Sequence, residues 1–141
     1  MPRRDTALAM SQENVEIVKD AYARSSRGDF DGLLALFDPG VEWVDDPLVA
    51  GAIPRRGHAE VERYFESLPR EREELRVELE RFVDYGDDVL ALALLTTRGR
   101  RGGPKIDRPF DAIFTLRDGK IVRGRSFSTR HDALKAAGLR E

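Results

Sequence analysis

The chain of 141 residues contains no cysteine, two histidines and one tryptophan. The absence of cysteine excludes disulfide bonds, thiolate metal sites and a cysteine nucleophile. His58 and His131 lie far apart, on different predicted elements, so no cluster with metal-ligand spacing can be recognised. Glycine-rich phosphate-binding loops are absent as well. We therefore expect neither a metal ion nor an organic cofactor.

An excess of charge of one sign is also lacking. The formal net charge is −2, although 35% of the residues are charged. This balance gives no field that would attract nucleic acid or an anionic membrane surface. No apolar run approaches the length of a membrane span, and the N-terminus lacks the apolar core of a signal peptide. The expectation is a cytoplasmic protein without nucleic-acid or membrane partners.

The clearest local signal is the stretch 108–129, which reads RPFDAIFTLRDGKIVRGRSFST. Two arms rich in apolar residues flank Asp118-Gly119, a dipeptide that tolerates the positive φ angles of a tight hairpin turn. We predict a long β-hairpin in the middle of a curved antiparallel sheet. Asp111 lies inside the first arm among apolar neighbours, so its carboxylate faces either solvent or a pocket.

Helical signals dominate the first half of the chain. Apolar residues recur at helical spacing after Ser11, a good N-cap, and Gly28 ends this helix. Asp29 is predicted to cap a second short helix that ends at 38–40. A third helix is expected from about His58 to Leu68, closed by Pro69, after a short strand at 41–44.

Strand signals dominate the second half. Leu75, Val77 and Leu79 alternate with charged residues, as in a half-buried strand, and 89–95 is a continuous apolar run typical of a strand covered on both faces. A last short helix is predicted at 131–138. This segregation indicates an α+β fold with helices packed on one face of an antiparallel sheet. Residues 1–10 lack periodicity and are predicted to form a flexible arm before a single domain, 11–141.

Three segments together resemble the SnoaL-like branch of the nuclear-transport-factor-two-like superfamily. They are 11–43, 56–65 and 114–139, which read SQENVEIVKDAYARSSRGDFDGLLALFDPGVEW, RGHAEVERYF and FTLRDGKIVRGRSFSTRHDALKAAGL. The resemblance implies a cone-shaped α+β barrel, in which a curved sheet packs on three helices around a pocket, and a homodimer. The superfamily includes ketosteroid isomerase, polyketide cyclases, scytalone dehydratase and limonene epoxide hydrolase, and also binders that catalyse nothing. Fold therefore does not settle function.

The resemblance to ketosteroid isomerase also suggests catalytic residues. Asp46, in an Asp-Pro pair after the first strand, fits the base of that family, although Asp45 competes for the place. Asp111 lies eight residues before the turn glycine, where the family has a protonated acid that donates to an oxyanion. The structural alternatives are a turn aspartate at 46 and, at 111, a solvent-facing aspartate paired with an arginine such as Arg123 or Arg125.

The same family register predicts residues around the ligand. Residues 111, 113 and 115 would face the pocket from one arm of the hairpin, and 122, 124, 126 and 128 from the other. Trp43 is expected in the core or the pocket wall, and Tyr22 is one residue away from the position of the family's tyrosine. The predicted substrate-binding residues are Tyr22, Trp43, Ile113, Ser126 and Ser128.

The sequence thus predicts a cofactor-independent enzyme that acts on a small, apolar or partly polar metabolite. Isomerisation, cyclisation, dehydration or hydrolysis by acid-base chemistry would suit the resemblance. The alternatives are a non-catalytic homodimer that binds a small ligand, and a dimerisation module. We expect the dimer to form through the outer face of the sheet, because 89–95 has apolar residues on both faces.

Overall fold

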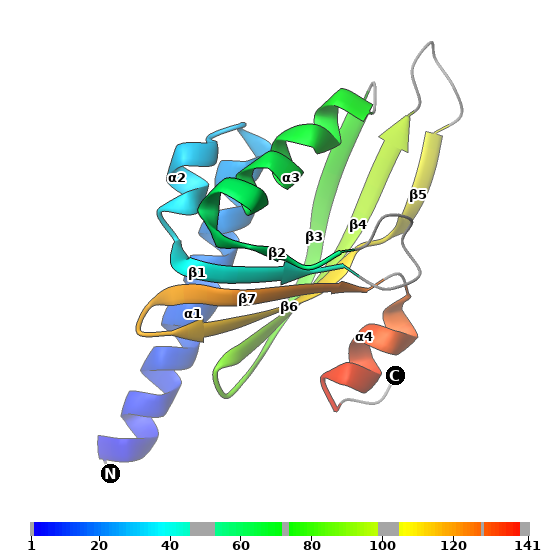
Figure 1. Cartoon of the computed structure of the whole chain (residues 1–141). Coiled ribbons are helices and arrows are strands. Elements are labelled where there is room, and N and C mark those ends of the chain that lie inside the picture. The colour runs from blue at the N-terminus through cyan, green and yellow to red at the C-terminus, as the bar shows by residue number, and fades with distance from the viewer. Residues whose placement is uncertain (1, 46–52, 72–73, 99–104, 128, 139–141) are drawn as a thin grey trace.

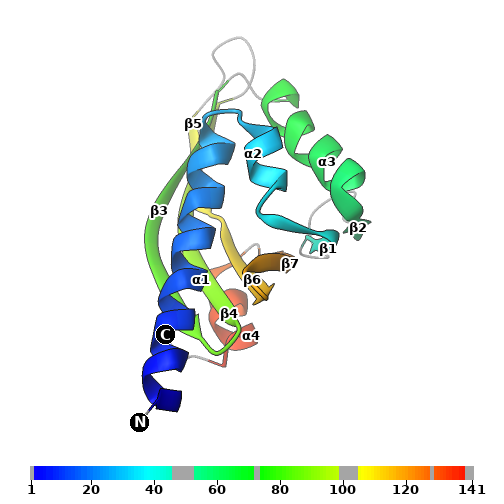
Figure 2. The same ribbon diagram turned by 90° about the vertical axis from the view of Figure 1, so that its left-hand side faces the viewer.

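The computed structural model describes residues 2–45, 53–71, 74–98, 105–127 and 129–138. Figures 1 and 2 show α1, α2 and α3 packed on the same side of a curved, unclosed sheet, whereas α4 stands apart from them. This is the predicted α+β architecture. The elements in chain order are α1 (Pro2–Ser26), α2 (Phe30–Leu34), β1 (Phe37–Val44), β2 (Arg55–Arg56), α3 (Gly57–Glu71), β3 (Glu74–Tyr85), β4 (Asp88–Arg98), β5 (Lys105–Pro109), β6 (Asp111–Arg117), β7 (Lys120–Phe127) and α4 (Arg130–Ala136).

The strands follow the order β2-β1-β7-β6-β4-β3, and β5 pairs with β4 outside this path. The hairpin of β6 and β7 therefore lies in the middle of the sheet, as predicted. All described strand pairs are antiparallel except β1 and β7, which run parallel. The prediction of a purely antiparallel sheet was wrong for this pair. Most of the chain separates the two strands, and a long connection allows parallel pairing where a tight turn does not.

The turn of the central hairpin is formed as the sequence predicted. Asp118 and Gly119 have φ angles of 52° and 77°, and two positive φ angles are what a two-residue hairpin turn of this kind requires. The hairpin is shorter than predicted at its first end. Arg108 and Pro109 belong to β5, which pairs with the far half of β4, whereas β6 begins at Asp111 and pairs with the near half.

Two predicted helix boundaries were wrong in the first half of the chain. α1 begins at Pro2 rather than Ser11. Proline is favoured in the first turn, and the segment 7–10 consists of strong helix formers. Phe37 opens β1 instead of closing α2, because the amide of Ile121 donates to Leu36 O at 2.9 Å and draws this segment into the sheet.

The other helix signals have mixed outcomes. Asp29 caps α2 as predicted, since its carboxylate accepts from Gly32 N at 3.0 Å. α3 continues to Glu71, so Pro69 lies inside its last turn and does not close it. The last helix has Thr129 as its N-cap, with the hydroxyl accepting from Asp132 N at 3.1 Å. Capping residues thus mark where α2 and α4 begin, whereas Pro69 does not mark where α3 ends.

A chain that begins at Met10 is expected to melt at nearly the same temperature as the full chain. Residues 1–10 lack the apolar periodicity with which a helix docks on a core, although 2–10 lie in the bounds of α1. Thermal unfolding followed by circular dichroism measures the effect. A drop of many degrees would show that the first turns of α1 stabilise the domain.

Two groups of buried apolar residues lie on opposite faces of the sheet. The inner group packs between the sheet and α1–α3 and includes Val89 and Ala91. The outer group packs around Ala133 of α4 and includes Leu90 and Leu92. The prediction that this strand is covered on both faces is confirmed for 89–93. α4 covers part of the outer face through which we predicted a homodimer, and the dimer itself stays a prediction.

The strand parity predicted for β6 was wrong. Ala112 and Phe114 belong to the inner group, whereas Ile113 packs in the outer group beside Leu90, Leu92 and α4. Side chains alternate strictly along a strand, so residue 113 cannot face the interior when its neighbours do.

No helix in the described parts of the chain is long and apolar enough to cross a membrane.

Candidate functional site

A buried carboxylate, Asp45, lies directly after β1 and is the centre of the candidate site. The residue is 6% exposed. Its Oδ1 accepts hydrogen bonds from Ser126 Oγ at 2.8 Å, Trp43 Nε1 at 2.9 Å and Tyr64 OH at 3.0 Å. The three donors come from β7, β1 and α3, so the tertiary fold assembles them. A buried charge needs such donors, because removal from water otherwise costs several kcal/mol.

The second oxygen of Asp45 is held less tightly. Its contact in the described structure is Arg55 Nη1 at 3.4 Å, longer than the 2.7–2.9 Å that is usual for a charge-assisted hydrogen bond. The guanidinium of Arg55 lies 4.1 Å from the ring centroid of Tyr64. Arg55 is therefore held by stacking on Tyr64 and by a hydrogen bond from Nη1 to Ile53 O at 3.2 Å, and it binds Asp45 Oδ2 only weakly.

Tyr64 keeps its proton in this environment. Burial raises the pKa of its phenol, and the charge of Asp45 and the hydrogen bond to it raise the pKa further. The nearby Arg55 cation lowers it by less. The phenol is thus a hydrogen-bond donor at neutral pH, as its contact with Asp45 Oδ1 requires.

A row of aromatic rings leads from this carboxylate into the interior. The Trp43 ring lies 5.1 Å from Phe65 and 5.8 Å from Phe114, and the Phe114 ring lies 5.7 Å from Tyr22. Trp43 is buried, as expected for a residue of the core or pocket wall. Its ring packs directly on the backbone of Gly124, where a Cβ atom would meet two ring carbons at 2.3 Å. Gly124 and Ser126 face inward, as predicted.

Asp111 is fully buried, but it lies beneath α4 and has its own partners. Arg130 Nε donates to Oδ2 at 3.1 Å and Arg130 Nη2 donates to Oδ1 at 3.0 Å, while Ala93 N donates to Oδ1 at 3.1 Å. The hydrogen bonds to Asp111 and then to Glu80 raise the pKa of the Arg130 guanidinium. This bidentate arrangement is typical of a structural ion pair.

The alternative of a solvent-facing Asp111 paired with an arginine was wrong in the exposure of the residue, and the arginine is Arg130. The residue is not exposed, and its partner is neither Arg123 nor Arg125. Arg123 lies 3.5 Å from Glu42, and the Arg125 guanidinium lies over the ring of Phe127. The fold brings in Arg130, which is 19 residues further along the chain, because α4 returns onto the outer face.

The remaining predicted site residues are placed as follows. Tyr22 lies on the inner face, and burial, followed by the charge of Asp111, raises its pKa. Asp46 and Ser128 lie outside the described residues. Asp45 and Asp111 share no hydrogen-bond partner in the described structure. Of the predicted residues, the structure thus gathers Trp43 and Ser126 around Asp45.

Sequence reasoning missed Arg55 and Tyr64 as parts of a site. Tyr64 lies inside the predicted third helix, and Arg55 lies between that helix and the predicted strand 41–44, so neither position marked a site. The signal that could have found Arg55 is the pair Arg55-Arg56. Neighbouring residues of a strand point to opposite faces, so one of two consecutive arginines turns inward.

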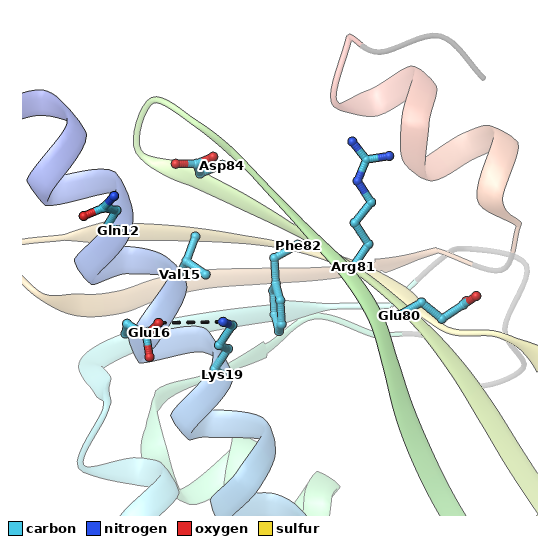
Figure 3. Close-up of a pocket in the computed structure, with 8 residues that line it drawn as sticks. All are labelled: Gln12, Val15, Glu16, Lys19, Glu80, Arg81, Phe82 and Asp84. Atoms are coloured by element: carbon cyan, nitrogen blue, oxygen red, sulfur yellow. Dashed lines mark ion pairs between the residues drawn. The ribbon is translucent and has the colours of Figure 1, made fainter.

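A separate open groove of about 540 Å³ lies between α1 and β3 (Figure 3). Charges of both signs surround it, and Lys19 lies 3.7 Å from Glu16 and 5.7 Å from the ring centroid of Phe82. None of the predicted site residues lines this groove. Its lining residues are Gln12, Val15, Glu16, Lys19, Glu80, Arg81, Phe82 and Asp84.

Metal-ligating side chains do not gather in the described parts of the chain, where no group of three or more His, Cys, Asp or Glu could hold an ion. His58 stands at the start of α3, with Nε2 2.9 Å from Phe37 O. This contact links the start of α3 to β1.

Comparison with known proteins agrees with this fold. Residues 18–124 match the SnoaL-like domain family. An NTF2-like protein from Burkholderia xenovorans LB400 is 30% identical, with a TM-score of 0.69 and coverage of 82% of this chain and 88% of that one. No curated protein matches.

Two further solved structures share the fold at lower identity. One is a protein with a ketosteroid isomerase-like fold from Catenulispora acidiphila DSM 44928, crystallised with trimethylamine (18% identity, TM-score 0.71, 89% and 94% coverage). The other is a candidate SnoaL-like polyketide cyclase from Jannaschia sp. CCS1 (22% identity, TM-score 0.73, 92% and 94% coverage).

The curved sheet with three inner helices defines a protein of the nuclear-transport-factor-two-like class. Within that class, this chain belongs to the SnoaL-like domain family.

Proposed function

We propose that the protein is a cofactor-independent enzyme that moves a proton on a small, largely apolar metabolite, with Asp45 as the base. The observation that carries the proposal is the asymmetry of the Asp45 carboxylate. Among the described residues, three neutral donors fix Oδ1, whereas Oδ2 has a single long contact, to Arg55. A base must be oriented and must keep an acceptor free for the proton it takes.

The surroundings of Asp45 suit abstraction of a proton next to a carbonyl group. Tyr64 OH and Ser126 Oγ are protonated donors beside the carboxylate, and the half-buried rings of Tyr64 and Phe65 offer an apolar surface to the rest of a substrate. Such donors stabilise negative charge that develops in a transition state when they can turn to it. Isomerisation and ring closure both begin with this step, and the likeness to a candidate polyketide cyclase supports them.

Asp45 here takes the role that the resemblance assigned to Asp46, which stays an alternative. We propose that Asp111 is the anchor of α4 rather than a protonated acid. It accepts three hydrogen bonds from the described residues, two of them from a guanidinium, and a carboxylate without a proton is suited to accept all three. We also expect a homodimer, formed through the part of the outer face that α4 leaves uncovered.

A second candidate function is a non-catalytic binder of small ligands. The ion pair of Asp111 and Arg130 favours it, because the second acid of a ketosteroid isomerase-like pair is then occupied. In that case Asp45 would only orient Tyr64, Trp43 and Ser126 as fixed walls of the site.

Exchange of carbon-bound protons tests the enzyme proposal without the natural substrate. Cyclic ketones such as 2-tetralone, and a set of β-keto esters, would be incubated with the protein in D₂O and followed by NMR. The wild type is expected to speed deuterium incorporation at the α-carbon. Asp45→Asn should lose that acceleration by on the order of 10²-fold or more, as is typical for a general base.

Asp46→Asn is the matched control, because it removes the neighbouring carboxylate. It should retain most of the exchange rate if Asp45 is the base. If the exchange rate is lost in Asp46→Asn and not in Asp45→Asn, the base is Asp46. A wild-type protein that leaves every probe at its background rate would favour the binder.

A further inference from the structure

Arg55 has hydrogen-bonding capacity that its neighbours do not use. Its Nη1 donates to Asp45 Oδ2 at 3.4 Å and to Ile53 O at 3.2 Å. The N–H groups of Nε and Nη2 have no hydrogen-bond partner among the described residues. A guanidinium carries five N–H donors and accepts nothing, so one whole edge of this group is left for another acceptor.

The edge formed by Nε and Nη2 is the one with which another arginine of this protein binds a carboxylate. Arg130 binds the two oxygens of Asp111 through its own Nε and Nη2, at 3.1 and 3.0 Å. The parallel pair of N–H groups matches the two oxygens of a planar carboxylate. In Arg55 the same pair is present, and no described residue accepts from it.

Arg55 is also held in place before any ligand arrives. Its residue pairs with Trp43 in the ladder of β1 and β2, and its guanidinium stacks on the ring of Tyr64. The side chain is 22% exposed, so it is reachable from solvent but partly desolvated. A fixed guanidinium loses little side-chain entropy on binding, which favours affinity.

We propose that Arg55 binds the carboxylate of a substrate at the Asp45 site, so that the substrate class is an apolar carboxylic acid. This inference adds a substrate class to the proposed function, and it rests on that function because only an enzyme has a substrate. A cationic ligand would be repelled by the positive charge of Arg55. A neutral ligand would leave the free N–H edge of Arg55 without a charged acceptor. Ile53 is 64% exposed two residues before Arg55 and, with the half-buried ring of Tyr64 on which Arg55 stacks, offers apolar contacts for the body of the acid.

Trp43 reports on this site directly, because it is the only tryptophan of the chain and donates to Asp45. Its fluorescence would be titrated with 3-phenylpropanoate and with the methyl ester of the same acid. The wild type is expected to bind the acid at least about tenfold more tightly than the ester, as befits a charge-assisted pair. Arg55→Gln should abolish the preference while still binding the ester, which shows that the site remains folded.

Arg56→Gln is the matched control. It removes the same charge from the adjacent residue, whose guanidinium is exposed and lies 2.6 Å from Glu42. The preference for the acid should survive in this variant. Equal losses in both variants would mean a general effect of charge and would overturn the inference. Arg55→Lys should retain part of the preference, because lysine keeps the charge but not the fork.

Two further outcomes would overturn the assignment. One is a wild type that binds acid and ester equally, or binds neither at millimolar concentration. The other is tighter binding of 2-phenylethylphosphonate, which would point to a phosphate-like anion. Failure of the enzyme proposal is separate, because deuterium exchange could be absent while the acid preference and its loss in Arg55→Gln persist. Arg55 would then be the anion-binding residue of a binder.

Discussion

Arg130→Met is expected to lower the free energy of unfolding by about 3–5 kcal/mol, the usual cost of breaking a buried ion pair from one side. Asp111 is fully buried, and without Arg130 its carboxylate would keep the backbone N–H of Ala93 as its described donor. A buried charge left with one donor is strongly destabilising. Unfolding by urea, followed by circular dichroism, measures the loss.

Arg123→Met is the control for removal of an arginine from the same sheet. Its side chain is 46% exposed and lies 3.5 Å from Glu42, so the expected cost is about 1 kcal/mol or less. The double variant Arg130→Met with Asp111→Asn should recover most of the loss, because no buried charge then remains. A loss below about 1 kcal/mol for Arg130→Met alone would show that the ion pair does not hold α4 on the sheet.

Gly124→Ala is expected to cost about 1–3 kcal/mol and to shift the emission of Trp43. The new Cβ atom would lie 2.3 Å from two carbons of the Trp43 ring, a distance that no pair of carbon atoms tolerates without movement. The ring is buried and packed against Phe65 and Phe114, so it has little room to retreat. Its hydrogen bond to Asp45 should weaken as the ring is displaced.

Gly40→Ala provides the comparison, because Gly40 lies in the same strand as Trp43. Among the described residues, a Cβ atom there would meet only Asp38 Oδ2 within 4 Å, at 3.4 Å, and the backbone does not need a positive φ. The expected change in stability is within about 0.5 kcal/mol. Similar losses for both glycines, with unchanged Trp43 emission, would mean that the loss reflects strand backbone entropy rather than the contact with Trp43.

The sequence by itself determined the features that depend on neighbouring residues. Asp118-Gly119 forms the predicted turn because both residues tolerate positive φ, and Asp29 caps α2 because its side chain reaches the amide of Gly32. The apolar run at 89–93 is buried on both faces, as a strand without polar alternation must be. These signals, with the family resemblance, were sufficient for the fold.

The tertiary structure decided which groups meet. Ile113 was predicted to line the pocket but faces α4, since sequence gives the alternation of a strand and not the face on which it starts. Asp111 found a partner in Arg130, 19 residues away, rather than in Arg123 or Arg125 on the adjacent strand. Pairing across a sheet and onto a helix depends on register and on where the chain returns.

The candidate site was decided in the same way. The sequence left Asp45 and Asp46 as rivals after the first strand, and the described structure places Asp45 inward, where donors from β1, β7 and α3 converge on one oxygen. Nothing local marks Ser126 or Tyr64 as its partners, because they are 81 and 19 residues away. Hydrogen bonds between such distant residues exist only after the sheet and α3 have packed, so their geometry is a property of the folded chain.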